Sequence, residues 1–367
     1  MKTINSLEVL SVVTSRTRGG KPIPLPQVEA IDFNFKRIGY LDAKDLAAAL
    51  ENGIFPQLKR IVLYDCAIGD EGAKALASAL ERGEPKTLEY IRFSCNRIGP
   101  DGAKALALAF ERGSFQALSG IRFGNCPIGS EGGAAFASAV ERGAFPRLEF
   151  VSIFDCGIGD GGAEALATAL RLGSFQRLTR IDLRGNDIGE EGAKALASAL
   201  EDGAFPQLKI IDLYRNEILD EGAKALATAF ERGSFQTLER IVLGLSRIGP
   251  EGAKALAAAL ERGSFPSLRC FGLYDDGIRE DHADVLASAL QRATLPSFGG
   301  VLYVPNWNSR MRVTQCVSDA AACARQRGRM LLFLNAENGK CEAAAKCFLV
   351  RDGDRAATWR TLEFMLS

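Results

Sequence analysis

Side chains that could carry acid–base or metal chemistry are few and scattered in this sequence. His282 is the only histidine among 367 residues, so any histidine-based general base or metal site would depend on this residue. Four cysteines follow, with six, seventeen and five residues between successive ones: Cys316, Cys323, Cys341 and Cys347. Zinc sites usually place about two to four residues between the cysteines of a pair. We therefore expect no catalytic residue and no metal, with a disulfide or a zinc ion in this cluster as the alternatives.

Pairs of acidic residues and a glycine-rich segment also have structural explanations. Asp70 and Glu71, like Glu190 and Glu191, stand where helices are predicted to begin, and acidic side chains there offset the positive end of the helix dipole. Residues 19–21 (GGK) lack the spacing and the strand–helix context of a phosphate-binding loop. The sequence therefore predicts no cofactor and no small-molecule substrate.

Most of the chain is a thirty-residue unit that is repeated nine times from Val28 to Ser297 without insertion or deletion, and His282 and the acidic pairs lie within it. Val28 opens the first unit, and a leucine opens each of the other eight. A fixed period of this length is typical of a solenoid, in which each unit buries apolar surface only against its neighbours. We expect residues 1–27 to form an N-terminal cap, 28–297 the nine repeats, and 298–367 a C-terminal α+β cap or a small appended module.

Each unit is predicted to form one short strand and one helix. In the second unit, Leu58-x-x-Ile61-x-Leu63 alternates apolar and variable residues, as a half-buried strand does. The following GDEGAKALASALERG (residues 69–83) has helical apolar spacing, with Asp70 at the predicted helix start and Gly83 at the C-terminal exit. Glycine at the exit favours a left-handed helix cap. Helices need about 8–10 Å between axes and paired strands only about 4.8 Å. The stack should therefore curve, with strands inside and helices outside.

The L-x-x-I-x-L-x-x-N/C-x-I-G pattern joined to GDEGAKALASAL resembles leucine-rich repeats of the ribonuclease-inhibitor type, which also occur in NOD-like receptors and Ran GTPase-activating proteins. The resemblance covers residues 28–297 and implies an α/β horseshoe with parallel strands on the concave face. It implies a protein-binding scaffold, free-standing or part of a larger complex, without identifying the partner, because this fold serves many functions. Two alternatives are a GTPase-activating protein, whose usual acidic C-terminal tail is missing here, and a bacterial effector acting in host cells.

Charge and hydropathy narrow the class of partner. Lys plus Arg and Asp plus Glu number 45 each, whereas a nucleic-acid-binding protein usually carries a basic excess. No apolar run approaches the roughly 20 residues that span a bilayer, so we expect no membrane insertion. The N-terminal segment has a short apolar patch interrupted by Glu8, which argues against a secretory signal. Its Arg and Ser content leaves organelle targeting open.

The cysteines within the repeats favour a reducing, cytoplasmic setting. The ninth position of a unit holds cysteine in three units and asparagine in three others: Cys66, Cys126 and Cys156, and Asn96, Asn186 and Asn216. Both residue types suit a buried turn, so these cysteines are interpreted as structural. Cys95 and Cys270 are isolated in different units and are expected to be free thiols.

Positions that vary among the units are the candidates for recognition. The third, fifth, seventh and eighth positions vary, and their side chains should face the inside of the horseshoe. These thirty-six sites are rich in Arg, Asp and aromatic residues and contain no Lys or Glu, a composition typical of protein interfaces. The predicted partner-binding residues are Arg60, Tyr64, Asp65, Tyr90, Arg92, Arg122, Phe150, Phe154, Asp155, Arg180, Asp182, Arg184, Asp212, Tyr214, Arg215, Arg240, Tyr274 and Asp275.

Further elements are predicted at the helix exits and at the two ends. Phenylalanine occupies the same exit position in seven units and should fill the space between layers: Phe55, Phe115, Phe145, Phe175, Phe205, Phe235 and Phe265. Leu7, Val9 and Leu10 are predicted to add an edge strand. The tail is predicted as strand 301–304, helix 313–327, strands 330–334 and 348–350, and helix 356–366.

The assignment of His282 and the tail cysteines to structural roles predicts the metal content of the protein. Elemental analysis after purification under reducing conditions should show no stoichiometric zinc, because the cysteine spacing does not suit a tetrahedral site. One equivalent of zinc that disappears in Cys341→Ser or Cys347→Ser would overturn this interpretation.

Overall fold

In a computed structural model, residues 2–6, 17–18, 21–36, 38–83, 86–113, 115–173, 175–203, 205–263 and 265–273 are described. Ten parallel strands form one sheet that follows chain order, apart from β2 (Thr17–Arg18) and β3 (Lys21–Pro22), which pair separately as an antiparallel ribbon. The sheet strands are β1 (Lys2–Ile4), β4 (Val28–Asp32), β5 (Arg60–Val62), β6 (Tyr90–Arg92), β7 (Gly120–Gly124), β8 (Phe150–Phe154), β9 (Arg180–Asp182), β10 (Ile210–Asp212), β11 (Arg240–Val242) and β12 (Cys270–Gly272).

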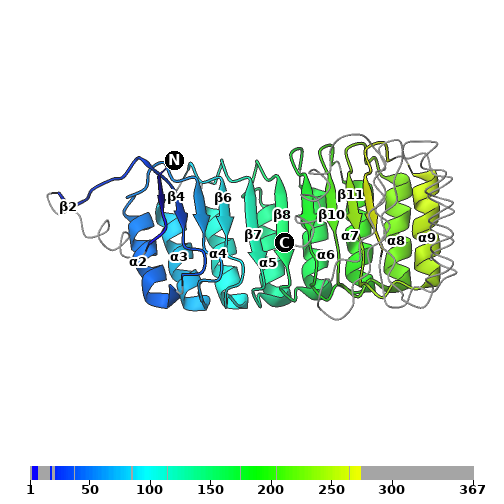
Figure 1. The fold of residues 1–367 in the computed structure, drawn as a ribbon, viewed down its shortest axis with the longest axis horizontal. Helices are drawn as coiled ribbons and strands as arrows, with labels where there is room; N and C mark the ends of the chain where they lie inside the picture. The colour runs from blue at the N-terminus through cyan, green and yellow to red at the C-terminus, as the bar shows by residue number, and fades with distance from the viewer. Residues whose placement is uncertain are drawn as a thin grey trace, which may run out of the picture.

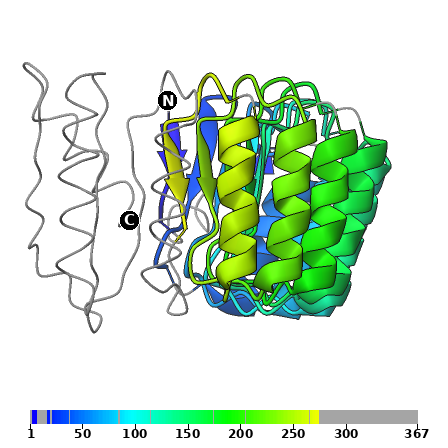
Figure 2. The same cartoon turned by 90° about the vertical axis from the view of Figure 1, so that its right-hand side faces the viewer.

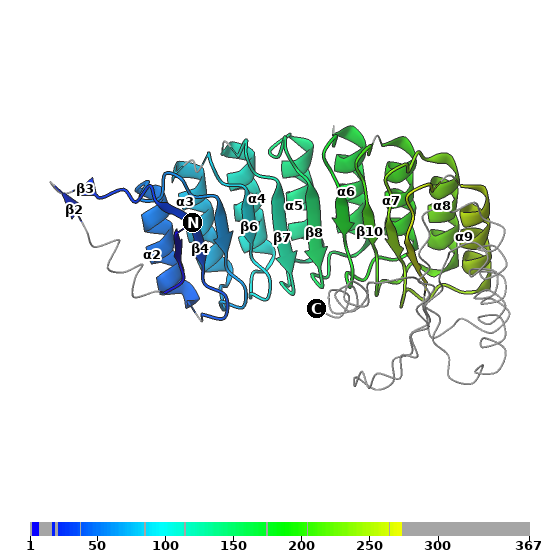
Figure 3. The same ribbon diagram turned by 45° about the horizontal axis from the view of Figure 1, so that its top comes forward.

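Between successive strands from β4 onward, the described chain forms one helix per unit. The helices are α2 (Gly39–Glu51), α3 (Asp70–Gly83), α4 (Pro100–Arg112), α5 (Gly129–Glu141), α6 (Gly159–Leu172), α7 (Glu190–Asp202), α8 (Leu219–Arg232) and α9 (Pro250–Arg262). The units stand side by side in sequence order (Figure 1), and the helices form a layer separate from the sheet (Figure 2). The strands line the concave face (Figure 3). The predicted α/β solenoid of one strand and one helix per unit is therefore confirmed.

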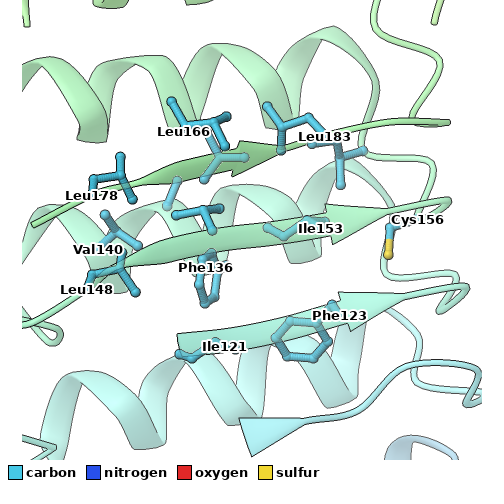
Figure 4. Close-up of a cluster of buried hydrophobic side chains, with 14 of the residues drawn as sticks. Ile121, Phe123, Phe136, Val140, Leu148, Ile153, Cys156, Leu166, Leu178 and Leu183 are labelled. Atoms are coloured by element: carbon cyan, nitrogen blue, oxygen red, sulfur yellow. The ribbon is translucent and has the colours of Figure 1, made fainter. Parts of the chain in front are cut away.

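The register between strands is as constant as the sequence period. Ile61 pairs with Ile91, and Ile91 pairs with Ile121, so each residue lies beside its counterpart thirty residues away. Side chains at these positions point away from the concave face into the space between sheet and helices, as Ile121 and Phe123 do in Figure 4. The predicted helix-exit phenylalanines are all buried, with Phe175 the least so at 7% exposure. Each layer is thus sealed against the next.

Adjacent helices approach so closely that one repeat position has room only for glycine. A Cβ atom added to Gly102 would lie 2.7 Å from Asp70 Oδ1 and 2.9 Å from the Cβ of Ala73 in the preceding helix. The contact is also polar, because Asp70 Oδ1 accepts hydrogen bonds from the N–H groups of Gly99 (2.7 Å) and Gly102 (2.9 Å). The acid at one helix start therefore caps the start of the next helix, in addition to the predicted compensation of the helix dipole.

The predicted left-handed cap at the helix exits is wrong for most units. Gly113 and Gly263 have φ of −82° and −71°, and similar values occur at Gly173, Gly203 and Gly233. Glycine is needed there for space, since a Cβ on Gly113 would lie 2.3 Å from the ring of Phe115. The inserted phenylalanine ring occupies the volume that a side chain would need. Left-handed glycines follow the helix only at Gly53 and Gly143 in the described residues.

The turn after each strand confirms the structural role of the ninth repeat position. Asn96 Oδ1 accepts the N–H groups of Cys66 (3.1 Å) and Ile68 (3.0 Å), so one side chain ties two units together. Cys66 instead donates its thiol to the carbonyl of Phe33 at 3.0 Å. Burial raises the pKa of the Cys66 thiol to about 12 and that of Cys126 to about 11, so both stay protonated and unreactive. No described cysteine forms a disulfide, Cys95 and Cys270 included.

An edge strand covers the N-terminal end of the sheet, but it is β1, which pairs in parallel with β4. Leu7, Val9 and Leu10, predicted to form such a strand, lie outside the described residues. The same is true of His282, of the four tail cysteines and of every element predicted after residue 273.

Substitution of Phe175 tests whether the stability of each unit comes mainly from contacts with its neighbours. Phe175→Ala removes a buried ring between layers and should lower the free energy of unfolding by roughly 3–5 kcal/mol. Hydrogen exchange should show lost protection centred on residues 148–207, because coupling in a solenoid is between nearest neighbours. Leu172→Ala, which truncates a nearby side chain that is 63% exposed, is the matched control and should change little. Uniform loss of protection along the whole chain would mean one cooperative block.

Candidate protein-binding surface

The concave face consists of three rows of strand side chains and the turn that follows them. The third, fifth and seventh repeat positions lie on the strands or directly after them, and their side chains meet across neighbouring units. The eighth residue has a left-handed backbone in every described unit, for example Phe35 (φ 60°), Asp65 (φ 53°) and Arg215 (φ 55°). This conformation ends each strand in a tight turn, so the eighth side chain lies at the margin of the face.

The ring tips of two phenylalanines on β8 lie over glycines of β7. A Cβ on Gly120 would fall 2.0 Å from the Phe150 ring, and one on Gly124 would fall 2.1 Å from the Phe154 ring. Each glycine stands thirty residues before its ring, at the same repeat position. Sequence reasoning selected both rings and missed both glycines, although a glycine followed one period later by an aromatic residue is a visible signal. Both predicted binding residues are therefore half-buried and fixed in place.

Arginine side chains stack on the aromatic rings of adjacent or nearby strands. The guanidinium carbon of Arg92 lies 4.3 Å from the ring centre of Tyr64, and that of Arg184 lies 4.7 Å from Phe154. Longer contacts join Arg60 to Tyr90 (5.6 Å) and Arg122 to Phe150 (5.7 Å). Tyr90 and Phe150 are themselves 5.9 Å apart between ring centres. Such cation–π contacts are worth about 0.5–2 kcal/mol each and restrict the rotamers of the arginines.

A buried carboxylate organises the middle of the face. Asp182 is fully buried, and its Oδ2 accepts hydrogen bonds from Arg180 Nη2 at 3.0 Å and Ser152 Oγ at 3.2 Å. Arg184 Nε lies 3.4 Å from the other carboxylate oxygen. Asp182 thus orients two predicted binding arginines and is itself inaccessible to a partner. Ser152, the strand neighbour that supports it, was not among the residues predicted from sequence.

Asp212 is the strand neighbour of Asp182 and is 8% exposed. Its Oδ1 accepts the N–H of Tyr214 at 3.2 Å. Burial raises the pKa of the Asp212 carboxyl above its usual 3.8, and the adjacent Asp182 raises it further. Two neighbouring acids in a buried setting are costly, and the Tyr214 N–H and the nearby Arg184 and Arg180 offset only part of that cost.

Three of the remaining predicted residues, Asp65, Asp155 and Arg215, lie at the turns along the margin of the face, and Arg240 lies on a strand. Asp155 and Arg215 form an ion pair of 3.4 Å across an intervening unit, where Gly185 leaves space, because a Cβ there would lie 2.1 Å from Asp155 Oδ1. Asp65 is exposed at its turn, and Arg240 is half-buried on β11. Tyr274 and Asp275 lie outside the described residues.

Within the described residues, no three His, Cys, Asp or Glu side chains stand close enough together to hold a metal ion. Over the same residues, the helices are too short or too polar to cross a membrane.

Comparison with known proteins identifies the repeat. A family model described as "Leucine Rich repeat" matches residues 57–77, 84–107, 148–167, 176–197, 206–227 and 236–257. The chain therefore contains leucine-rich repeats and folds as an α/β leucine-rich repeat solenoid. Repeats of this family generally mediate protein–protein interactions. No curated protein sequence matches the chain.

Similar solved structures include the actin-binding site 2 of leiomodin-1, at 20% identity and TM-score 0.31, covering 40% of this chain and 82% of that one. The TLR13–ssRNA13 complex shares 16% identity at TM-score 0.40, covering 76% and 36%. An internalin (InlF) from Listeria monocytogenes shares 15% identity at TM-score 0.38, covering 77% and 86%. Likenesses this distant carry no argument about the partner of this chain.

The raised pKa of Asp212 predicts a pH-dependent effect on stability. A carboxyl whose pKa is higher in the folded than in the unfolded state contributes its full stability only below the unfolded pKa, and loses it as pH rises through the folded pKa. Asp212→Asn keeps an acceptor for Tyr214 but cannot ionise. It should raise the free energy of unfolding at neutral pH, and the gain should shrink as pH falls toward 3.8.

Denaturant titrations at neutral and acidic pH measure this difference. Asp65→Asn, on an exposed side chain of the same face, is the control and should change the unfolding free energy little at either pH. A gain of equal size at both pH values, or a loss at neutral pH, would contradict the assignment of Asp212 as a buried, poorly compensated acid.

Proposed function

We propose that this protein is a non-catalytic scaffold that binds a protein partner through its concave face, either free-standing or as a subunit of a larger complex. The observation that carries the proposal is the ordered set of arginine–aromatic stacks, led by Arg92 on Tyr64 and Arg184 on Phe154. Arginine and tyrosine are enriched among the few residues that contribute most of the binding energy of protein interfaces. Here they occupy adjacent positions on one sheet.

The same stacks reduce the entropic cost of binding. Long side chains that become ordered on association cost about 0.5–1.5 kcal/mol each. Arg180 and Arg184 are already held by the buried Asp182, and Phe150 and Phe154 lie against β7. A partner would therefore meet side chains that are in position before binding.

The convex face differs in kind. Its helices join through repeated ion pairs between exposed side chains, such as Arg82 with Glu51 at 2.8 Å and Arg232 with Glu201 at 3.0 Å. Exposed pairs of this type contribute little to stability, but they do satisfy their charges within the protein. The convex surface thus has regular, self-compensated polarity, whereas the concave surface varies from unit to unit.

We further infer a reducing compartment, such as the cytoplasm, for the site of action. The support is that Cys66, Cys126 and Cys156 are buried as free thiols that hold the turns. Free thiols of this kind persist where disulfides are kept reduced.

Alanine substitutions on the two faces test the proposed function. Partners captured from cell extract by the wild-type chain should be lost or weakened with Tyr64→Ala, Phe154→Ala or Tyr214→Ala. Each should weaken binding of a purified partner by roughly 1–3 kcal/mol, as for interface anchors generally. Mass spectrometry identifies the partner, and calorimetry measures the change in affinity.

Three exposed helix lysines provide matched controls: Lys74, Lys194 and Lys224. Their replacement by alanine should leave affinity nearly unchanged, and thermal unfolding should verify that every variant folds. Equal losses from both faces would remove the concave-face assignment, as would concave variants that fold and bind normally.

A further inference from the structure

The N-terminal half of the concave face carries three arginines that form no ion pair with a described residue. The Arg92–Arg122 patch consists of Arg60, Arg92 and Arg122 on β5, β6 and β7, with the rings of Tyr64, Tyr90 and Phe150 against them. Among the described concave-face positions, ion pairs form only where Asp182 meets Arg180 and Arg184, and where Asp155 meets Arg215. None of the three arginines of the patch forms an ion pair with a described residue, and, of the carboxylates, only Asp182 acts at longer range on Arg122.

The geometry of the patch leaves the guanidinium groups able to bind. Tyr64 stacks against Arg92, and Phe150 supports Arg122, so aromatic rings occupy part of the surface of each cation. A stacked guanidinium still offers N–H donors at its edge, in the fork that matches a carboxylate. Arg92 uses Nε in a long hydrogen bond of 3.4 Å to Ser94 Oγ, while no described residue accepts a hydrogen bond from the buried Nε of Arg122.

The patch destabilises the protein in the absence of a ligand. Arg92 and Arg122 are direct partners in the register between β6 and β7, where parallel strands are about 4.8 Å apart. Burial lowers the pKa of Arg122 most, and the positive charges of Arg180 and Arg92 lower it further, while Tyr90 and Asp182 partly oppose this. Like charges side by side and partly desolvated destabilise one another. A negatively charged ligand would relieve both penalties.

We propose that the Arg92–Arg122 patch binds an acidic segment of the partner polypeptide, with its carboxylates on the arginines and its apolar side chains on the flanking rings. This proposal rests on the proposed function and adds the chemistry of the partner. Carboxylate–guanidinium pairs on a half-buried surface are charge-assisted hydrogen bonds, which are stronger than neutral ones. Complementary charge would also speed association at low salt.

A nucleic acid fits the face less well than an acidic peptide. A phosphate backbone running along the concave face would need free cationic side chains beyond the patch, but Arg180 and Arg184 are already paired with Asp182, and Arg215 with Asp155. Those arginines offer a continuous polyanion little free positive charge, whereas a polypeptide can carry its acidic residues in one short segment.

The C-terminal part of this chain is also a poor occupant by charge. Residues 298–367 contain ten Lys and Arg against six Asp and Glu, so the segment carries the same sign of charge as the patch. A separate acidic partner is therefore the better match.

The test begins with the full chain and a displayed library of random peptides. Peptides enriched on the wild-type protein should carry clustered Asp and Glu with nearby apolar residues. An enriched peptide, labelled with fluorescein, should lose affinity at least about tenfold for Arg92→Gln and Arg122→Gln, a change of about 1.4 kcal/mol. An amide version of the peptide, with Asn and Gln replacing the acids, should bind the wild-type protein as weakly as the acidic peptide binds the arginine variants. Added salt should lower the affinity of the acidic peptide for the wild-type protein.

The matched control is Arg112→Gln, which removes a convex arginine paired with Glu81 and should leave peptide affinity unchanged. Arg60→Gln, on an exposed side chain, repeats the test if a half-buried variant unfolds. A single-stranded RNA oligonucleotide that binds more tightly than the acidic peptide, and is lost with the same variants, would replace this proposal by a nucleic-acid surface. If the library yields no enrichment of acidic peptides, the proposal is also overturned.

The outcomes also separate this proposal from the proposed function. Enriched peptides that lack acidic residues but lose binding with Tyr64→Ala or Tyr214→Ala would refute the acidic partner and keep the concave face as the binding surface. Enriched peptides whose binding ignores those two substitutions would refute the concave face itself.

Discussion

The close contact between successive helices is the constraint on which the rest of the structure depends. At Gly192 a side chain would overlap Asp160 Oδ1 at 2.6 Å and the Cβ of Ala163 at 3.0 Å, so the helices meet at backbone distance. The Asp160 carboxylate fills the gap and accepts the N–H groups of Gly189 and Gly192. This small separation brings the spacing between successive helices close to the spacing between successive strands.

The same constraint divides the chain into fixed and variable positions. Residues between sheet and helices touch counterparts in the units on either side, so a change in one unit affects three layers. Concave positions have only lateral neighbours, and there the sequence varies from Tyr64 to Phe154 to Arg184 at one repeat position. Variation without loss of the scaffold allows such a protein to acquire a particular partner. It also explains why identity of the repeat says little about identity of the ligand.

Much of the fold could be predicted because the same pattern of apolar, polar and glycine positions recurs in nine units. Strand, helix, buried phenylalanine and buried turn cysteine followed from periodicity alone. The helix-exit prediction failed because glycine satisfies two different demands, a left-handed backbone or missing volume, and the sequence does not distinguish them. At Gly113 the demand is volume, set by the ring of Phe115. Only three-dimensional contact reveals which demand applies.

The residue composition of the concave face predicted which residues belong to the candidate site. It did not predict what each of them does there. Asp182 and Arg184 both stood out as variable concave residues, yet Asp182 is buried and Arg184 is the side chain it orients. Which carboxylate meets which arginine depends on side-chain reach across strands, and the register alone does not determine it. The supporting Ser152 and Gly120 were missed because small residues have no interface signature of their own.

Site-specific photocrosslinking in the cells that express the protein tests the central claim most directly. A photoreactive amino acid at Ile210, half-buried on the concave face, should crosslink a partner protein. The same group at Leu108, 41% exposed on α4, should give no comparable product. A partner trapped from Leu108 and not from Ile210, with both variants folded, would contradict the account.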